Sequence, residues 1–477
     1  MHCIDAVIMA AGKGTRMKSS RPKVLHRLAG RPMLGYVLDA AAAAGARRCV
    51  LVTGHGAAEV EAYARHWANA EGQESAPAPA APQLLTARQQ PQLGTGHAVQ
   101  QAAPLLPEDG ITLILNGDAP LVRPETLTRL LALCAGGHLA LLTVDDGTDA
   151  GAYGRVVRAA AGSDAPVRAI VEARDATPAQ LARTEWYSGV MAAPTPLLKR
   201  CLALLTDDNV QREFYLTDVV RHAVAAGATV RALCLANAIE AAGINSPRQL
   251  AQLERVVQQR TAERLMESGV RLADPARLDV RGQLECGQDV EIDIGCVFQG
   301  RVALADGVTI GAHCVIANAR IGPGAVIHPF THIDGEAQGV QIGPGARVGP
   351  FARLRPGAQL GEQVHIGNFV EVKNSTLAAG AKANHLAYLG DAEVGERVNY
   401  GAGSITANYD GVRKHRTVIE ADVHVGSNCV LVAPLTIGAG GTVGAGSTLT
   451  RSTPPGALSV TRAPQKIHPN WPRPGKK

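Results

Sequence analysis

The chain has 477 residues, more than one hydrophobic core usually organises, so two or three domains are expected. Lys and Arg exceed Asp and Glu by only five residues, and no basic stripe is interleaved with aromatic residues, which argues against a nucleic-acid partner. Nine scattered cysteines without a Cys-x-x-Cys pair favour free thiols in a reducing cytoplasm, and nothing resembles a signal peptide or a membrane span of roughly 20 apolar residues.

Up to about residue 235, short aliphatic runs alternate with helical patterns, which is typical of an α/β domain with a largely parallel sheet. The expected strands span residues 6–10, 49–53, 111–115, 139–144 and 230–235, and the expected helices span residues 32–44, 125–134 and 216–226. An Ala- and Pro-rich run at residues 76–82 is expected to form a solvated loop.

The first expected strand runs into a glycine loop, Ala11-Gly12-Lys13-Gly14-Thr15-Arg16-Met17. Glycines allow backbone N–H groups to approach phosphate oxygens, and Lys13, Arg16 and Lys23 would supply positive charge for a triphosphate. The loop matches neither the Walker pattern nor the dinucleotide fingerprint, because Lys13 lacks a correctly spaced Ser or Thr and Met17 replaces the third glycine. Taken alone, the segment fits either a phosphate-binding loop or an ordinary turn between a strand and a helix.

A second polar segment, Asn116-Gly117-Asp118, follows the expected strand at residues 111–115. Sites in open α/β sheets lie at the carboxyl ends of strands, where Asp118 could hold Mg²⁺ against phosphates, although a turn aspartate fits the segment equally well. Leu93-Gly94-Thr95-Gly96-His97 forms a second glycine loop that enters a helix and would suit a base or a ribose.

Ser246-Pro247-Arg248-Gln249 has the pattern of a capping box and predicts the start of a helix. Apolar residues continue at helical spacing until Gly269, so we expect an exposed helix of about 20 residues that joins the α/β domain to the rest of the chain.

Beyond the helix, aliphatic residues return every six positions from Ile292 to Leu449. Helices repeat at 3.6 residues and isolated strands at 2, so neither explains this period. A parallel β-helix does, since a chain wound as a triangular prism places one short strand on each face and one aliphatic residue per hexad on the axis. The span predicts about nine coils and a rod of roughly 40 Å at ~4.8 Å per coil.

The period of six fails between Val372 and Val394, where the next positions would be Ala378, Asn384 and Gly390. We interpret this interval, which contains His385, as an irregular insert that bulges outward. Residues 407–417, with a basic run at residues 413–416, form a second break and are expected to protrude as a loop. The tail beyond Leu449 is Pro-rich and basic, a composition that usually indicates disorder.

Four segments of the first 245 residues carry a specific resemblance: Gly94-Thr95-Gly96-His97, Gly117-Asp118, Tyr153-Gly154-Arg155 and Glu172. Together with the glycine loop and the hexads, they resemble the bacterial bifunctional N-acetylglucosamine-1-phosphate uridyltransferase/glucosamine-1-phosphate acetyltransferase family over nearly the whole chain. The resemblance implies a Rossmann-like uridylyltransferase domain at residues 1–245, a helical linker at 246–269, and a left-handed β-helix acetyltransferase domain with a C-terminal tail at 270–477.

The resemblance also implies the residues of the first active site, where a sugar 1-phosphate would attack the α-phosphorus of UTP and release pyrophosphate. The Mg²⁺ ligands would be Asp118 and Asn245. The residues that line the UTP and sugar-nucleotide site would be Met9, Ala10, Ala11, Gly12, Lys23, Gln89, Gly94, Thr95, Asn116, Gly117, Asp118, Gly154, Glu172 and Asn245. The sequence departs from the family at Trp186-Tyr187-Ser188-Gly189, because Tyr187 stands where the family carries an asparagine, so the effect of Tyr187 on sugar recognition is left open.

In the β-helix, the resemblance implies acetyl transfer from acetyl-CoA to the amine of glucosamine 1-phosphate, with His385 as the general base. Histidine titrates in the range that this proton transfer needs. The sugar phosphate would contact Arg355, Lys373, Tyr388 and Asn399. The acetyl-CoA positions would be Ala402, Asn408, Tyr409, Ser427, Ala445 and Arg462. The family forms homotrimers with acetyl sites between neighbouring rods, and its product, UDP-N-acetylglucosamine, is a precursor of bacterial cell envelopes.

Two alternative functions also fit a chain that combines a nucleotide-binding domain with a β-helix. In one, the enzyme only transfers nucleotides and the β-helix serves assembly or regulation, which the irregular segment around His385 argues against. In the other, the rod is a passive binding scaffold, which would need an uninterrupted surface ladder of like residues that the sequence lacks.

Overall fold

The computed structural model describes residues 3–74, 82–148, 150–162 and 164–473. The chain forms two compact units, the first extending to Glu254 and the second beginning at Arg255. The loop expected at residues 76–82 lies, apart from Pro82, outside the described residues. Within the described ranges, no helix has both the length and the apolar character needed to cross a membrane.

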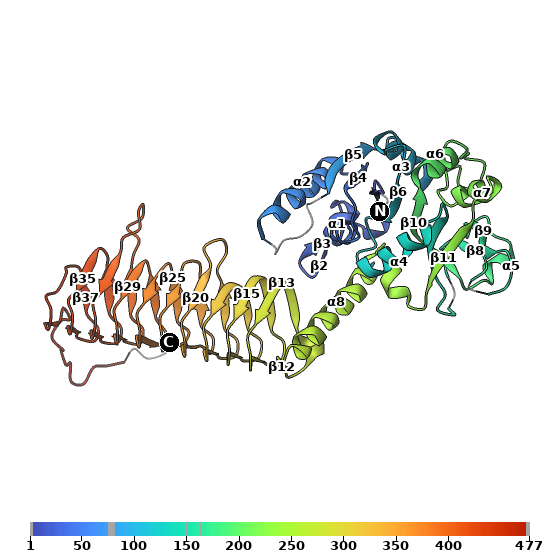
Figure 1. Ribbon diagram of the computed structural model, residues 1–477. Helices are drawn as coiled ribbons and strands as arrows, with labels where there is room; N and C mark the ends of the chain where they lie inside the picture. Colours follow the sequence, from blue (N-terminus) through green and yellow to red (C-terminus); the bar gives the residue numbers. More distant parts are fainter. Residues whose placement is uncertain (1–2, 75–81, 149, 163, 474–477) are drawn as a thin grey trace. The chain divides into compact units, whose positions relative to one another are not determined.

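The first unit is built on one mainly parallel sheet (Figure 1). Its strands lie in the order β11 (Val230–Leu235), β7 (Leu139–Val144), β10 (Trp186–Pro194), β6 (Ile111–Asn116), β1 (Ile4–Ala10), β4 (Arg48–Thr53) and β5 (Gln83–Arg88). Every expected strand is present, and the expected α/β class is confirmed. The antiparallel strand β10, which was not expected, pairs with both β6 and β7 and contains a bulge between Tyr187 and Met191 that interrupts its pattern.

Two helical layers cover the sheet because the side chains of each strand alternate between its faces. In β1, Ile8 belongs to one apolar cluster and Val7 belongs to the other. The helices on the Ile8 side are α1 (Met33–Ala43), α2 (Ala57–Glu74) and α4 (Pro124–Cys134). The helices on the Val7 side are α3 (Thr95–Ala102), α6 (Thr195–Leu202) and α7 (Asp218–Ala225).

A small antiparallel extension brings further polar residues to the sheet. Strand β8 (Arg155–Arg158) pairs with β10 and with β9 (Val167–Val171). Gly154 precedes β8 and Glu172 follows β9, and the backbone N–H of Tyr187 in β10 donates to the carbonyl of Gly154 over 2.9 Å. The pairing therefore places these three residues together.

The second unit is a prism of stacked parallel coils, as expected from the hexads (Figure 1). One of its faces is an eleven-stranded parallel sheet. Its strands are β12 (Arg271–Leu272), β14 (Glu291–Ile292), β16 (Thr309–Ile310), β18 (Val326–Ile327), β21 (Arg347–Val348), β24 (His365–Asn368), β27 (Lys382–His385), β30 (Asn399–Tyr400), β33 (His424–Val425), β36 (Thr442–Val443) and β38 (Leu458–Ser459). All but β12 and β38 belong to the predicted span, which agrees with about nine coils there.

The expected aliphatic residues all point inward and are buried, and a second, smaller inward residue stands two positions before many of them. Ala352, Ala358 and Val364 take these second positions before Leu354, Leu360 and Ile366. Three cysteines occupy such positions, and their thiols donate to carbonyls of the next coil, as from Cys314 to His328 over 3.2 Å. All nine cysteines are free, as expected.

The interpretation of residues 372–394 as an irregular insert is wrong. The inward residues of this interval are Leu377, Ala383 and Leu389, which stack on Leu360, Ile366 and Val372 of the coil before. The register changes because Val372 to Leu377 and Leu389 to Val394 are steps of five residues, so two turns are one residue shorter. His385 therefore lies in an ordinary coil, at the end of β27.

Two further expectations need correction at the ends of the prism. Helix α8 (Pro247–Glu267) is not fully exposed, because Ala262 and Leu265 belong to the apolar core of the prism and Gln258 exchanges hydrogen bonds with the backbone of Val280 over 2.9 and 2.7 Å. The tail is not wholly irregular, since β38 extends the sheet. Residues 408–416 do protrude as expected, with residues 409–414 exposed.

Candidate functional sites

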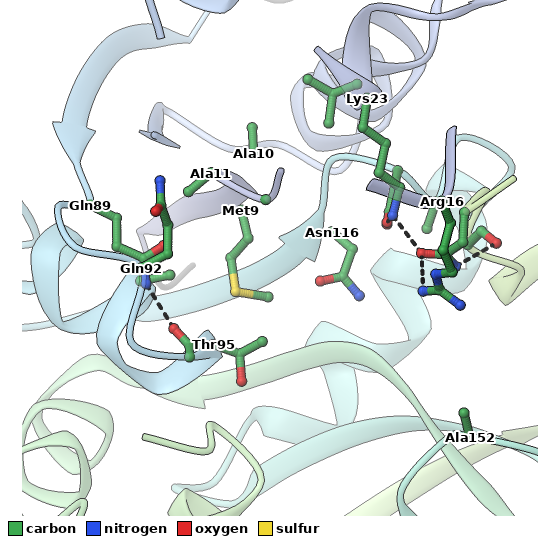
Figure 2. A pocket seen from close by; sticks show the side chains of 18 of the residues that line it. Met9, Ala10, Ala11, Arg16, Lys23, Gln89, Gln92, Thr95, Asn116 and Ala152 are labelled. Carbon is green, nitrogen blue, oxygen red and sulfur yellow. Dashed lines mark hydrogen bonds and ion pairs between the residues drawn. The ribbon is translucent and has the colours of Figure 1, made fainter. Parts of the chain in front are cut away.

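A pocket of about 610 Å³ in the first unit opens at the carboxyl ends of β1 and β6. Such crevices are the usual ligand sites of open α/β sheets. Figure 2 shows Lys23 and Arg16 at one end of this pocket, Gln89 and Thr95 at the other, and Asn116 between them.

The glycine loop after β1 contributes backbone rather than lysine charge to the pocket. Ala11 and Gly12 line it, and a Cβ on Gly12 would meet no atom within 4 Å, so this backbone is open to a ligand. Gly14 has a φ of +60°, and a Cβ there would lie 2.7 Å from Cβ of Lys23. Of the three expected cations, Arg16 and Lys23 line the pocket, whereas Lys13 is exposed and is not among the lining residues.

Two side-chain oxygens, one from Asp118 and one from Asn245, converge on the ammonium of Lys23 at the end of the pocket. The ammonium of Lys23 forms an ion pair with Asp118 and donates to the amide oxygen of Asn245 over 2.6 Å. Arg16 also donates to that amide oxygen, over 2.9 Å. The side chains of Lys23 and Asp118 are only 13% and 23% exposed, so the charges interact in a poorly hydrated place.

The backbone explains why these residues meet. The N–H of Ile244 donates to the carbonyl of Asp118 over 2.9 Å, and the N–H of Asn245 donates to the side chain of Gln249 over 2.8 Å. The side-chain oxygen of Ser246 accepts from the backbone of Gln249 over 3.3 Å. The predicted helix cap thus also anchors Asn245, which sequence spacing did not reveal.

The second glycine loop closes the other end of the pocket. The side chain of Gln89 donates to the carbonyl of Gly94 over 2.8 Å, and the N–H of Gly96 donates to the carbonyl of Phe214 over 2.7 Å. Gly94 has a φ of +106°, and a Cβ there would lie 2.6 Å from the carbonyl oxygen of Phe214. The glycines are needed here because the segment at Phe214 presses directly on the loop.

A smaller cavity of about 170 Å³ adjoins this pocket and shares Met9, Thr95, Asn116 and Ser188 with it. Gly154, Glu172 and Tyr187 line this second cavity. Burial raises the pKa of Glu172, and its carboxylate accepts a hydrogen bond from the hydroxyl of Thr217 over 2.9 Å. Burial, and secondarily the charge of Glu172, raises the pKa of the Tyr187 phenol far above its usual value.

Most residues predicted for the first site therefore gather at two adjoining cavities. Gly117 is the exception, because it lines neither of them and instead donates through its N–H to the carbonyl of Met9 over 3.0 Å. Several lining residues were not predicted because no loop or strand-end pattern marks them, and they include Gln92, Ala152, Tyr153, Ser188, Glu213 and Gln249. No group of three or more His, Cys, Asp or Glu side chains suited to a metal occurs among the residues that the structure describes.

On the prism, His385 is exposed at the end of β27, and its Nδ1 lies 2.9 Å from Oδ1 of Asn368. An amide oxygen only accepts hydrogen bonds, so Nδ1 of His385 donates to Asn368, which leaves Nε2 available for another contact. Asn368 and His385 are register partners of β24 and β27, and the sequence contained no signal that would pair them.

A cationic cluster lies on the next face of the prism. Arg355 donates to the carboxylate of Glu371 over 2.7 Å. The neighbouring ammonium of Lys414, with smaller contributions from partial burial and Arg355, lowers the pKa of Lys373. A Cβ on Gly390 would collide with the hydroxyl of Tyr388, which places that hydroxyl beside the register partner of Lys373. Lys414, from the protruding loop, was not predicted here.

The remaining predicted residues follow this region along the coils. The Nδ2 of Asn399 lies 3.1 Å from the Nδ1 of His424. The side-chain amide of Asn408 donates to the carboxylate of Asp391. Arg462 donates to the carbonyl of Ala445 over 2.7 Å. Three others take outer or turn positions on neighbouring coils: Ala402, Tyr409 and Ser427.

Comparison with known proteins places both units in described families. Residues 6–272 match the MobA-like NTP transferase domain, and residues 339–374 match the bacterial transferase hexapeptide (six repeats). The protein called Bifunctional protein GlmU from Polaromonas naphthalenivorans (strain CJ2) is 68% identical over 477 residues, covering 100% of this chain and 99% of its own length. The protein of the same name from Paracidovorax citrulli (strain AAC00-1) is 65% identical over 485 residues, covering 100% of this chain and 99% of its own length. The solved structure of a UDP-glucose pyrophosphorylase complexed with UDP-glucose matches with a TM-score of 0.45 at 16% identity, covering 55% of this chain and 100% of that chain.

Proposed function

The chain belongs to the bifunctional GlmU family, and from this premise and the two sites above we propose that it catalyses two successive transfers. Acetyl-CoA acetylates glucosamine 1-phosphate on the prism. The first unit then couples N-acetylglucosamine 1-phosphate to UTP and releases pyrophosphate. The observation that carries the proposal is that each unit holds its own set of polar groups suited to one of these reactions.

In the first unit, the substrate phosphates would lie against the loop after β1. Backbone N–H groups around Gly12 would donate to phosphate oxygens, while Arg16 and Lys23 would offset the charge that gathers on the transferring phosphoryl group. The sugar 1-phosphate oxygen attacks the α-phosphorus, the bond to the β-phosphate oxygen breaks, and pyrophosphate leaves. Little proton transfer is needed, because the attacking phosphate is already anionic.

The donor set at Asp118 and Asn245 fits Mg²⁺. A carboxylate and an amide oxygen are the hard ligands that Mg²⁺ prefers, and both already converge on the ammonium of Lys23. Bound there with phosphate oxygens and water, the ion would withdraw negative charge from the reacting phosphate. Asp118 and Asn245 would hold it, and Lys23 would turn toward the substrate.

On the prism, His385 would act as the general base. Asn368 holds the Nδ1 proton, so Nε2 can take a proton from the amine as it attacks the thioester carbonyl. Arg355, Lys373, Tyr388 and Asn399 would bind the sugar phosphate and keep the amine near Nε2. The bond from carbonyl carbon to sulfur then breaks, and coenzyme A leaves as a thiol.

Acetyl-CoA would lie along the following coils. The residues proposed for it are Ala402, Asn408, Tyr409, Ser427, Ala445 and Arg462. A homotrimer in which rods lie side by side would complete these sites between neighbouring chains, and the cytoplasm would supply all three substrates.

Omitting each substrate in turn tests the proposal. With glucosamine 1-phosphate and acetyl-CoA alone, we expect a free thiol to be released, and with N-acetylglucosamine 1-phosphate and UTP alone, we expect Mg²⁺-dependent pyrophosphate release. Thiol release that does not depend on the amino sugar would contradict the acetyl-transfer assignment. It would leave a nucleotidyltransferase with the prism as an assembly module.

A further inference from the structure

The protruding loop at residues 408–416 is attached to the prism at Asp391, a residue that neither site above includes. Asp391 lies at the corner between β28 (Tyr388–Gly390) and β29 (Ala392–Val394). Its carboxylate accepts a hydrogen bond from the side-chain amide of Asn408, which begins the loop. Its carbonyl accepts another from the backbone N–H of Thr417, which follows the loop, over 3.2 Å. One residue therefore holds both ends of the loop.

The carboxylate of Asp391 is itself held by the preceding coil. Its other oxygen accepts a hydrogen bond from the side-chain amide of Asn374 over 2.5 Å, and its N–H donates to the carbonyl of Lys373 over 3.1 Å. Asp391 and Asn374 have positive φ angles of 50° and 44° at equivalent corners of successive coils. The corner therefore fixes the direction of the carboxylate independently of the loop.

The bond between Asp391 and Asn408 is a stronger tether than the ion pair at the end of the loop. Asn408 is only 9% exposed, and a hydrogen bond to a carboxylate is strengthened where water is excluded. The ion pair joins Arg416 to Glu393, whose side chains are 60% and 50% exposed, and pairs as exposed as this contribute little. Removing the carboxylate of Asp391 should therefore release the loop, whereas removing that of Glu393 should not.

The loop has a structure of its own, so its base determines where its tip lies. Tyr409 and Lys414 pair across the loop as an antiparallel bridge. At the tip, the carboxylate of Asp410 accepts a hydrogen bond from the N–H of Arg413 over 2.6 Å. Tyr409 is one of the residues proposed for acetyl-CoA, and the ammonium of Lys414 neighbours that of Lys373. The loop thus carries groups that the acetyl-transfer site needs, and Asp391 holds its base.

We infer that Asp391 is a positioning residue of acetyl transfer, which anchors the loop so that Asn408 and Tyr409 face acetyl-CoA. Asp391 touches no substrate and acts through Asn408. Without this anchor, acetyl-CoA would have to order the loop on binding, which weakens binding and leaves the chemical step unchanged. This inference rests on the proposed function, because it concerns a substrate that the prism is proposed to bind.

Asp391→Asn removes the anchor with little change of shape, because asparagine tolerates a positive φ. An amide has one acceptor oxygen, so the variant accepts from Asn374 or from Asn408 but not from both. The KM for acetyl-CoA, measured through thiol release, should rise about 10-fold, while kcat should stay within about twofold because bound acetyl-CoA orders the loop. Asp422→Asn is the matched control, since Asp422 has a φ of 59° at another corner and pairs with Arg397 over 2.7 Å.

Limited trypsin digestion without substrate reports on the loop directly, because the loop contains Arg413 and Lys414. Cleavage after these two residues should be about 10-fold faster in Asp391→Asn than in the wild type or in Glu393→Gln. Adding Asn408→Asp to Asp391→Asn exchanges the donor and the acceptor of the tether. This double variant should therefore regain the wild-type cleavage rate.

Wild-type KM and cleavage rate in Asp391→Asn would overturn the inference, as would a lowered kcat with an unchanged KM. Cleavage throughout the prism would indicate that this variant unfolds, and the double variant then decides, because failure to regain resistance to trypsin overturns the inference as well. A wild-type enzyme that releases no thiol from acetyl-CoA with glucosamine 1-phosphate would instead refute the proposed function.

Discussion

At the residue scale, both candidate sites consist of charged or unpaired groups that protein contacts satisfy only in part. Lys23 lies between two oxygen donors that suit a metal ion, and Lys373 lies beside the like charge of Lys414. Neither arrangement is one that stability alone would favour. A bound anionic substrate would interact favourably with the positive charges of Lys23 and Lys373, so these residues are the first to test.

Substituting His385 by Ala should lower acetyl transfer by ~10²- to 10⁴-fold, the usual contribution of a general base. Uridylyl transfer should be unchanged, because His385 belongs to the second unit. The two reactions are measured separately on one preparation, through thiol release and pyrophosphate release. Asn368→Ala should cause a smaller loss of acetyl transfer, since the imidazole remains but is no longer oriented. An equal fall in both reactions would point to misfolding.

Asp118→Asn should have the reverse effect. Removing the carboxylate weakens cation binding, so pyrophosphate release should fall by ~10²-fold and should need more Mg²⁺ for half-maximal rate. Acetyl transfer should be retained. Asp109→Asn, which alters an exposed carboxylate outside the pocket, serves as the control. Normal Mg²⁺ dependence in Asp118→Asn would refute the proposed metal site.

The pH dependence of acetyl transfer should depend on the pKa of Lys373, which lies beside Lys414 on the prism. Because Lys414 lowers the pKa of Lys373, Lys373 loses its proton at a lower pH than a free lysine does. The KM for glucosamine 1-phosphate should therefore rise early as the pH increases from 7 to 10. Lys414→Gln removes the like charge and should shift this rise to higher pH. Arg416→Gln, in the same loop, is the control, and an identical shift in both variants would contradict this explanation.

At the element scale, the prism depends on which residue of each turn faces the axis. A simple count of six from Val372 would place Gly390 inward, whereas the structure places Leu389 there. Turns shortened by one residue keep the coils stacked, because the strands on each face still align with those of the next coil. The β-structure therefore controls the register more strongly than the sequence period does.

Leu389→Ala tests this register. It removes a fully buried side chain and should lower the free energy of unfolding by about 2 to 5 kcal/mol, measured in urea. Leu458→Ala makes the same chemical change at a side chain that is 70% exposed, and should change it by less than about 0.5 kcal/mol. Equal effects of the two substitutions would mean that Leu389 does not face the axis.

At the scale of the whole molecule, the chain consists of two compact units, and each contains one of the two candidate sites. Stacked aromatic rings run along one corner of the prism, where Phe330, Phe351 and Phe369 lie 5.1 and 5.5 Å apart between successive ring centroids and are about half exposed. An exposed apolar row of this length agrees with the proposed packing of rods in a trimer.

Co-expression of two inactive variants tests whether neighbouring chains share the acetyl site. If His385 and Arg462 act in one site from different chains, mixed trimers of His385→Ala and Arg462→Ala should recover about a quarter of the wild-type acetyl transfer. In random mixtures about three quarters of trimers are mixed, and each has one intact site of three. Separately purified and mixed variants, which do not exchange chains, are the control. No recovery in co-expressed trimers would place both residues of a site in one chain.

The sequence by itself determined the architecture and the chemical types of the sites. Each coil and each strand buries apolar residues that lie close together in the sequence. The hexads and the aliphatic runs therefore predicted both units. Glycine loops and a strand-end carboxylate likewise pointed to the nucleotide pocket, and the family resemblance named about half of the residues that line it.

Only the tertiary structure decided which side chains act together. Asn368 meets His385 across 17 residues, and Lys23 meets Asn245 across 222 residues. No period or motif encodes such a pair, since it depends on which coils stack and which strand ends converge. The hydroxyl of Tyr187, which is buried without a hydrogen-bond partner among the described residues, is likewise visible only after folding.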